Sequence, residues 1–272
     1  PVQAIKMATI NTAKCYGLKH LGAISPGFQA DFVVLDNLQD LNVTDVFYKG
    51  KLVDRNAPIR VKTCDGALKH TVHLDKVKAE QFVLPIGKKK THVIGINPSQ
   101  ITTEDLAVSL QPAANYVPTD GYSKVAAVER PHNTGKIGVA VAKGYGIRNG
   151  AVASSVSHDS HNIIVIGDND RDMALAVDEI IRTQGGYTVV ENGEVFETLP
   201  LPIMGLMSDA GFESVNETLG RMIKKAHEMG VPADIEPFIT LSFLALPVIP
   251  TLRITPRGLC LLTAKGPEIL QE

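Results

Sequence analysis

Five short apolar runs between residues 92 and 168 are the feature that most limits the folds open to this chain. They occupy residues 92–96, 124–130, 137–146, 151–157 and 162–168. Runs of this length, rich in valine, alanine and isoleucine, are typical of buried β-strands. Helical patterns accompany these runs but do not alternate with them one for one. We therefore predict an α+β fold with a mixed sheet rather than a doubly wound one.

Two helices in the second half of the chain have defined start and stop signals. The first follows Asp168 or Asn169 as N-cap and ends at the glycine pair 185–186. Its apolar face carries Met173, Val177, Ile180 and Ile181. For the second, Ser214 and Glu217 form a capping-box pattern, and Gly230 marks the end. Between them, Asn192-Gly193 predicts a β-hairpin turn.

The first sixty residues predict a short helix followed by a small three-stranded sheet. The pattern from Val2 is helical, Asn11 is a candidate N-cap for a further turn, and Gly17 ends it. Strands are expected at Phe32–Leu35 and in a hairpin that turns at Lys49-Gly50. Because three strands hardly form an independent sandwich, we expect other sequence or a second chain to cover their edges. The start at Pro1, without an initiator methionine, suggests a piece cut from a longer protein.

Residues 61–90 are polar and irregular, and we predict that they form a connector. The segment ends in three lysines and contains an H-x-x-H pattern at His70 and His73. Two histidines in a charged linker are more often solvated than bound to a metal. The predicted division is therefore 1–20, 21–60, a connector over 61–90, and an α/β domain over 91–272.

Composition excludes several classes of function. Lys and Arg number 27 against 29 Asp and Glu, so a net charge of -2 gives no reason to expect nucleic acid or an anionic membrane as partner. No apolar run approaches the roughly 20 residues that cross a bilayer. The cysteines, Cys15, Cys64 and Cys260, are odd in number and widely spaced, which favours structural thiols in a reducing cytoplasm.

Two groups of polar side chains lie at the ends of predicted strands. Hydrophobic packing gains nothing from polar residues at these positions. Ser157, His158, Asp159 and His161 separate two of the apolar runs, and Glu129, Arg130 and His132 follow another. In a turn, though not in a strand, the two histidines of the first group can converge. Neighbouring groups of this kind would form a site. The alternative is that these residues are surface groups or hydrogen-bonded supports of the loops.

No sequence pattern requires a metal within this chain. The imidazoles and carboxylates of the two groups are chemically suitable ligands, but their spacing is not specific. The H-x-E and P-C-x-x-C pattern of zinc deaminases is absent, as is H-E-x-x-H. Glycines in residues 95–105 and 142–150 match no phosphate-binding loop and predict turns, so we assign no cofactor to them.

Two stretches carry a resemblance to known enzymes. The run "GAISPGFQADFVVLD", Gly22 to Asp36, resembles the carboxyl-terminal signature of the amidohydrolase superfamily. Residues 125–180, with "LPLPIMGLMSD" and "FITLSFLALPVIP", resemble the extra C-terminal domain of the bacterial-type adenine deaminase family, and the likeness extends to about Leu252. Members commonly carry a second histidine where this chain has Pro131, which puts a paired imidazole there in doubt. The resemblance to this family is weaker after Gly258.

The resemblance implies that residues 1–20 are the last helix of a (β/α)8 barrel and residues 21–60 part of a β-sandwich. It implies hydrolysis of adenine to hypoxanthine and ammonia in purine salvage, with a divalent metal (manganese, iron or zinc) held by barrel strands that precede Pro1. Within this chain it points to a loop over the barrel mouth, with His158, Asp159 and His161 as catalytic candidates. The substrate-binding candidates are Glu129, Arg130, His132 and Ser157.

The expected partners are adenine, the chain's own barrel domain and further copies of the chain. Two alternatives stay open at this point. The C-terminal domain could be a structural cap or an oligomerisation domain with no catalytic role, or the enzyme could be a cyclic amidohydrolase with another substrate.

Overall fold

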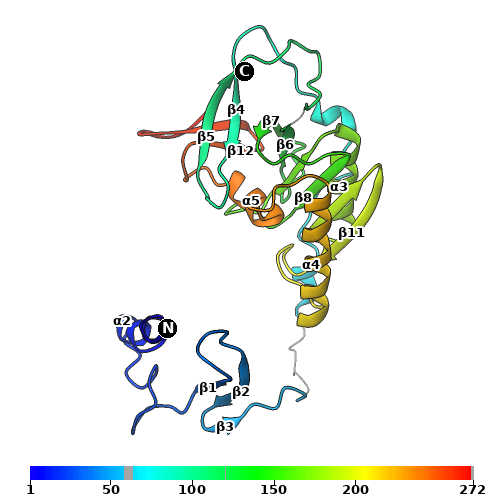
Figure 1. Ribbon diagram of the computed structural model, residues 1–272. Helices are drawn as coiled ribbons and strands as arrows, with labels where there is room; N and C mark the ends of the chain where they lie inside the picture. The colour runs from blue at the N-terminus through cyan, green and yellow to red at the C-terminus, as the bar shows by residue number, and fades with distance from the viewer. Residues whose placement is uncertain (58–63, 120, 271–272) are drawn as a thin grey trace. The chain divides into compact units, whose positions relative to one another are not determined.

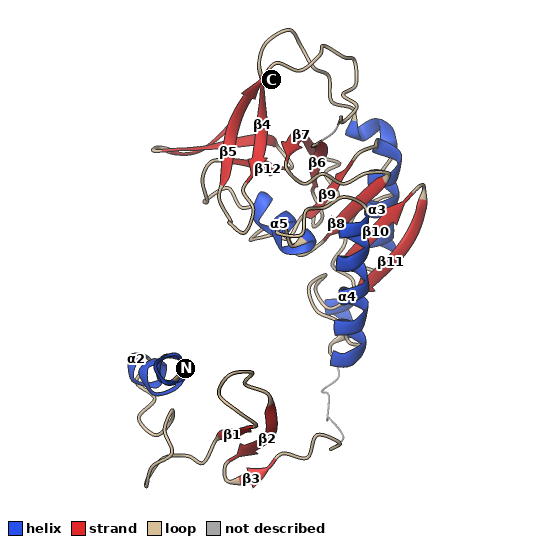
Figure 2. Cartoon of the chain, viewed as in Figure 1, coloured by secondary structure: helices blue, strands red, loops and turns tan. Residues whose placement is uncertain are grey.

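A computed structural model describes residues 1–57, 64–119 and 121–270, which divide into two compact units. Unit 1 comprises Pro1–Thr63 and unit 2 comprises Cys64–Glu272. The fold is α+β, as the sequence predicts (Figures 1 and 2). No helix in the described part of the chain has the length and apolarity needed to span a membrane.

Unit 1 begins with one continuous helical segment. It consists of α1 (Val2–Lys6), a π-helical turn η1 (Met7–Asn11) and α2 (Thr12–Cys15). Asn11 directly precedes α2 as predicted, but it has helical dihedral angles and its side chain makes no capping hydrogen bond. The helical hydrogen bonding simply continues past it. Gly17, at φ +69°, follows the end of the helix as predicted.

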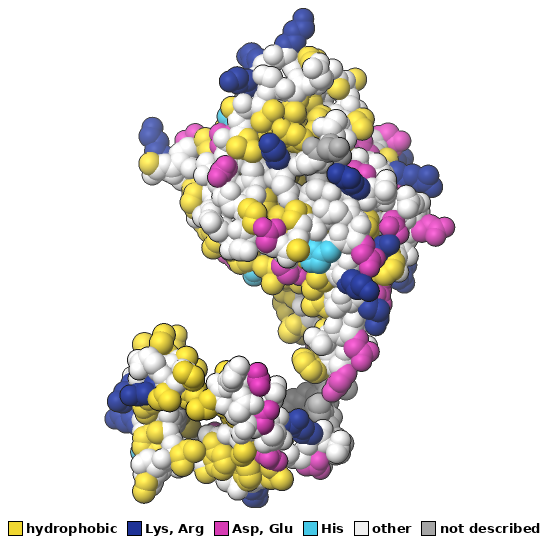
Figure 3. Space-filling model, in the orientation of Figure 1, with side chains coloured by type: hydrophobic (Ala, Val, Ile, Leu, Met, Phe, Trp, Pro, Cys, Tyr) yellow, Lys and Arg dark blue, Asp and Glu magenta, His cyan; other side chains and the backbone are white. Residues whose placement is uncertain are grey.

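The sheet of unit 1 has the predicted strands. β1 (Phe32–Leu35) pairs antiparallel with β2 (Val43–Tyr48), and β2 pairs with β3 (Lys51–Leu52) around Lys49-Gly50. Many of its apolar side chains are exposed, and Figure 3 shows hydrophobic side chains across one face. They include Val33, Val34, Tyr48 and Leu52. That these residues form part of a sandwich remains a prediction.

Unit 2 is built around one eight-stranded sheet. The strand order is β11-β10-β8-β9-β6-β7-β4-β5, and every neighbouring pair is antiparallel except β4 and β7. The bounds are as follows: β4 Thr91–Ile96, β5 Thr103–Val108, β6 Tyr122–Val128, β7 Ile137–Lys143, β8 Gly150–Ser154, β9 Ile163–Gly167, β10 Gly186–Glu191 and β11 Glu194–Pro200. The five predicted strand runs are all present, as β4 and β6 to β9. The prediction missed β5.

Both faces of this sheet are covered, so its central strands are buried on both sides. On one face, Ala126 and Val128 pack with α3 (Asp170–Arg182). On the other, Val125 and Ala127 pack with α4 (Phe212–Glu228) and α5 (Pro237–Leu244). Side chains alternate between the faces of a strand, which is why near-continuous apolar runs are needed here. β12 (Leu252–Thr255), β13 (Gly258–Thr263) and β14 (Gly266–Ile269) form a small third sheet.

The helix and hairpin signals were partly correct. Asn169 caps α3 by accepting the backbone N–H of Asp172 at 2.9 Å, and the β10–β11 hairpin turns at Asn192-Gly193. The predicted capping box at Ser214 is wrong, because α4 begins three residues earlier, with Gly211 as N-cap and no side-chain cap. Ser214 lies inside the first turn.

Residues 64–90 pack into unit 2, although the sequence suggests a connector. Two 3₁₀ helices, η2 (Gly66–Lys69) and η3 (Ala79–Phe82), lie in this segment. Val72, Val77 and Phe82 are buried in the same core as α3. These few, widely spaced apolar residues are enough to anchor a polar segment. Because their spacing follows neither a helix nor a strand period, a search for hydrophobic periodicity does not detect them. His70 and His73 are exposed, as expected of solvated histidines.

Candidate functional site

A short loop between β8 and β9 gathers the first group of polar residues. The backbone N–H of His161 donates to the carbonyl of Ser157 at 2.7 Å and closes a turn, with His161 at φ +50°. The rings of His158 and His161 therefore lie on one side of the loop, with centroids 6.1 Å apart. The expected convergence of the two imidazoles is confirmed. We call Ser157–Asn162 the β8–β9 loop.

Strand register brings the second polar group next to this loop. β6 and β9 are antiparallel with Val128 opposite Ile163, so the residues after β6 lie beside those before β9. The backbone N–H of Arg130 donates to Asn162 Oδ1 at 3.2 Å. The two polar groups are thus neighbours at one edge of the sheet, as the sequence analysis required of a site.

Glu129 and His132 have local roles in this arrangement. The Glu129 carboxylate accepts the backbone N–H groups of His132 at 2.8 Å and Thr134 at 3.0 Å, and the Thr134 hydroxyl at 3.1 Å. Burial opposes ionisation, but these hydrogen bonds together lower the pKa of Glu129. The carboxylate therefore stabilises its own turn, and the His132 side chain is exposed.

Helix α5 supplies two contacts that the sequence analysis missed. The carbonyl of Ser242 accepts the backbone N–H of His158 at 3.2 Å, and the ring of Phe243 lies 5.1 Å from that of His158. α5 starts at Pro237, with Glu236 as N-cap accepting from Ile239 N–H. The first of these contacts uses a backbone carbonyl, so no side chain in the sequence signalled it.

Polar atoms without partners are concentrated here. Seven buried side-chain atoms of the described residues make no hydrogen bond, and four belong to this site. They are Arg130 Nε, Ser157 Oγ, His161 Nδ1 and Ser242 Oγ. Burial, with the charges of Arg130 and His158, lowers the pKa of His161 and so favours its neutral form. Buried polar atoms are normally paired, so this concentration marks a functional candidate.

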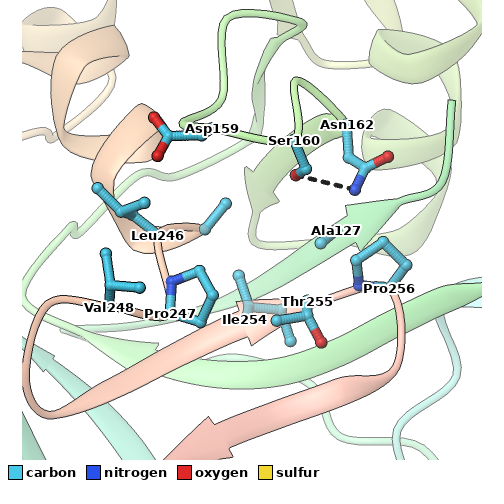
Figure 4. A pocket seen from close by; sticks show the side chains of 11 residues that line it. Ala127, Asp159, Ser160, Asn162, Leu246, Pro247, Val248, Ile254, Thr255 and Pro256 are labelled. Carbon is cyan, nitrogen blue, oxygen red and sulfur yellow. Dashed lines mark hydrogen bonds between the residues drawn. The ribbon is translucent and has the colours of Figure 1, made fainter. Parts of the chain in front are cut away.

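A pocket of about 300 Å³ borders the other side of the loop. Figure 4 shows Asp159, Ser160 and Asn162 along one side and apolar side chains along the other. The apolar lining comes from the sheet, the segment after α5 and β12, and comprises Ala127, Ala245, Leu246, Pro247, Val248, Ile254 and Pro256. An apolar cavity with a few polar groups at its rim suits a small, flat and partly polar molecule.

The residues of this site do not form a metal centre. No group of three or more His, Cys, Asp or Glu side chains with suitable geometry occurs in the part of the chain that the structure describes. The Asp159 carboxylate lies 3.8 Å from His158 Nδ1 and is 84% exposed. Two imidazoles and one carboxylate could supply three metal ligands, but the Asp159 carboxylate is exposed and the described residues bring no such set together.

A model of the family described as adenine deaminase C-terminal domain matches residues 100–265, more than half of the chain. The chain belongs to this family. A model of the amidohydrolase family matches residues 1–53, which covers the helix and small sheet of unit 1. The adenine deaminase C-terminal domain therefore contains the β8–β9 loop, Arg130 and the pocket.

Similar proteins from several bacteria are named adenine deaminase. The adenine deaminase of Desulfitobacterium hafniense is 51% identical over 261 residues, 95% of this chain and 46% of the relative. Those of Clostridium acetobutylicum and Bacillus pumilus are 41% and 40% identical, again over 46% of their length. The chain thus spans about half the length of the relatives it matches.

Proposed function

We propose that this chain is the C-terminal portion of an adenine deaminase, which hydrolyses adenine to hypoxanthine and ammonia when joined to a metal-binding amidohydrolase domain. Relatives named adenine deaminase are 40% to 51% identical to it along almost its whole length. The match of residues 1–53 to the amidohydrolase family supports the link to such a domain. A cytoplasmic role in purine salvage and assembly into oligomers form part of the same proposal.

The β8–β9 loop contributes to purine binding in this proposal. The observation that carries it is the pocket of about 300 Å³, whose polar rim is formed by that loop. Asp159 lines the pocket and accepts a hydrogen bond from a purine N–H, whereas His158 and His161 do not line it and act through the loop that carries Asp159. The Leu246–Val248 segment supplies apolar contact to the flat faces of the base.

A divalent metal held by the amidohydrolase domain would supply the activated water, and no described residue of this chain is assigned as its ligand. The residues of this chain act on the substrate instead. They orient the base and exclude bulk water from it, so their removal affects binding and positioning more than the intrinsic reactivity of the water. Arg130 and Ser157 support the loop from its buried side.

A second function, structural capping or oligomerisation, is favoured by a different observation. The segment between β11 and the start of α4 exposes three apolar side chains. Met204, Met207 and Phe212 are 42%, 52% and 74% exposed. Exposed apolar groups close together in the chain commonly mark a surface that contacts another protein segment.

Steady-state kinetics of the intact enzyme test the proposed function. His158→Ala and Asp159→Ala should each raise KM for adenine or lower kcat by about 10-fold or more, as expected for loss of one or two substrate contacts. Matched controls are His92→Ala and Glu194→Ala, which lie on other strands. Unchanged constants in both loop variants would remove the loop from catalysis and favour the structural role. Purines and pyrimidines assayed side by side decide whether another cyclic substrate is preferred.

A further inference from the structure

One side of the pocket is formed by a short segment that follows α5. Leu246, Pro247 and Val248 line the cavity on the side opposite its polar rim, and we call these three residues the pocket wall (Figure 4). The segment makes two consecutive turns, because Leu246 N–H donates to the carbonyl of Phe243 at 3.1 Å and Ile249 N–H donates to that of Leu246 at 3.2 Å. Val248 is 65% exposed. Short exposed turns of this kind are readily displaced unless their ends are anchored.

A single buried guanidinium anchors both ends of the pocket wall. Arg253 lies on β12 and is 1% exposed. Its Nη1 donates to the carbonyl of Phe243 at 3.0 Å, before the wall, and its Nε donates to that of Ile249 at 2.8 Å, after it. Nη2 donates to the carbonyls of Pro250 and Ile101, each at 2.7 Å. Together with the two turn bonds, the contacts to Phe243 and Ile249 close a ring of hydrogen bonds around the wall.

The positive charge of Arg253 is not used in an ion pair. No acidic side chain among the described residues pairs with it, and burial lowers its pKa to about 10. The buried Lys124, by contrast, is paired with Asp170 at 2.5 Å. Burying a cation without a counter-charge is costly, and apolar side chains fill such a space at less cost. What an arginine supplies here is a planar fork of donors that reaches several carbonyls at fixed angles.

The same turn of α5 also holds the polar rim of the pocket. The carbonyl of Ser242 accepts the backbone N–H of His158, and the ring of Phe243 lies 5.1 Å from the His158 ring. His158 directly precedes Asp159, which lines the cavity. Because Arg253 binds the carbonyl of Phe243, it ties the wall to the turn that carries the loop on the other side.

We propose that Arg253 is a positioning residue that sets the distance between the pocket wall and the β8–β9 loop, and so the affinity of the pocket for a flat heteroaromatic base. The inference rests on the proposed binding of purine at this pocket. Arg253 itself does not touch the base, because Ile254 lines the cavity and successive residues of a strand face opposite ways. The wall contacts the base equally before and during the reaction, so its displacement weakens binding and leaves the chemical step unchanged.

Steady-state kinetics of the intact enzyme test this role in Arg253→Lys, which keeps the charge but has three donors in place of the planar fork. KM for adenine should rise about 10-fold or more, and the inhibition constant of hypoxanthine, which reports binding without chemistry, should rise by the same factor. The kcat value should stay within about 2-fold of the wild type. Arg253→Met, which loses all four hydrogen bonds, should raise both binding constants further.

Val177→Ala is the control for a loss of stability alone. Val177 is buried in the core on the other face of the sheet, so its truncation lowers the Tm without reaching the pocket. It should leave KM, kcat and the inhibition constant unchanged. If Val177→Ala raises KM as much as Arg253→Lys at an equal loss of Tm, the role of Arg253 is purely structural and the inference is overturned. Should Arg253→Met fail to fold, Arg253→Lys and Val177→Ala still make this comparison.

Asp159→Ala, measured in parallel, separates the inference from the proposed function. If Asp159→Ala impairs adenine binding and Arg253→Lys does not, the wall needs no anchor. The inference is then overturned, while the proposed function stands. If neither variant changes KM, kcat or the inhibition constant, the pocket does not bind purine and both fall. A lower kcat with unchanged KM in Arg253→Lys would also contradict a role in binding.

Discussion

The Asn162 side chain joins two strand ends, because its Oδ1 accepts the backbone N–H of Arg130 at 3.2 Å. Its Nδ2 donates to Ser160 Oγ at 3.1 Å, so one amide ties the end of β6 to the β8–β9 loop. Both residues of the first hydrogen bond are buried. Strand register brings the two polar groups together, and this amide adds a buried bond between them.

Asn162→Ala should lower the free energy of unfolding by about 1–3 kcal/mol, because it leaves the buried N–H of Arg130 without an acceptor. Urea unfolding followed by circular dichroism measures the change. Ser160→Ala is the matched control, since it removes only the second, part-buried bond and should cost no more than about 1 kcal/mol. Equal effects of the two substitutions would show that the Asn162–Arg130 bond does not hold the loop.

Gly205→Ala should destabilise unit 2 and displace Arg130. The new Cβ would lie 1.9 Å from Arg130 Nη1, and the backbone has φ +71°, which an alanine adopts only with strain. Gly135→Ala provides the comparison, because Gly135 has φ +70° and nothing within 4 Å of its Cβ position. Gly135→Ala should cost about 1 kcal/mol from the dihedral angle alone. A Gly205→Ala effect no larger than this would mean that the guanidinium moves freely.

Lys124→Met should be among the most destabilising single substitutions in the chain. Lys124 is 1% exposed, and its removal leaves Asp170 without its cation. Loss of one partner from a buried pair costs about 3–5 kcal/mol. Lys224→Met is the comparison. Lys224 Nζ lies 3.9 Å from Glu228 Oε1 and its side chain is 79% exposed, so its loss should change stability by less than about 0.5 kcal/mol. Chemical denaturation of both variants makes the comparison.

Stability should fall as the pH drops below the unfolded pKa of histidine, in part because of His161. Burial lowers the pKa of His161 in the folded state, so between the lowered value and 6.5 the unfolded chain binds more protons than the folded one. Unfolding is then increasingly favoured as the pH falls through that window. His161→Asn removes this contribution and suits the positive φ.

The measurement for His161 is the free energy of unfolding at several pH values between 7 and 5. His161→Asn should lose less stability over this interval than the wild type. The exposed control His132→Asn should keep the wild-type slope. If the free energy of unfolding of His161→Asn fell with pH as steeply as that of the wild type, the His161 imidazole would not contribute to the pH dependence.

Local sequence patterns were sufficient for most elements of unit 2. The apolar runs predicted β4 and β6 to β9, and Asn169 with the glycine pair 185–186 predicted the limits of α3. The same patterns misplaced the start of α4 at Ser214, because a capping-box sequence also fits within a first turn. They missed the packing of Val72, Val77 and Phe82, whose spacing follows the surface that they meet and not a helical or strand period.

The sequence by itself determined most strands and helices of unit 2, and it singled out His158, Asp159, His161 and Arg130. Those properties depend on near neighbours in the chain, through side-chain alternation, caps and turns. Only the tertiary structure decided that Arg130 lies beside Asn162, that Ser242 contacts the loop and that Glu129 is used within its own turn. These contacts follow from strand order and register and from helix packing, which depend on residues distant in the chain.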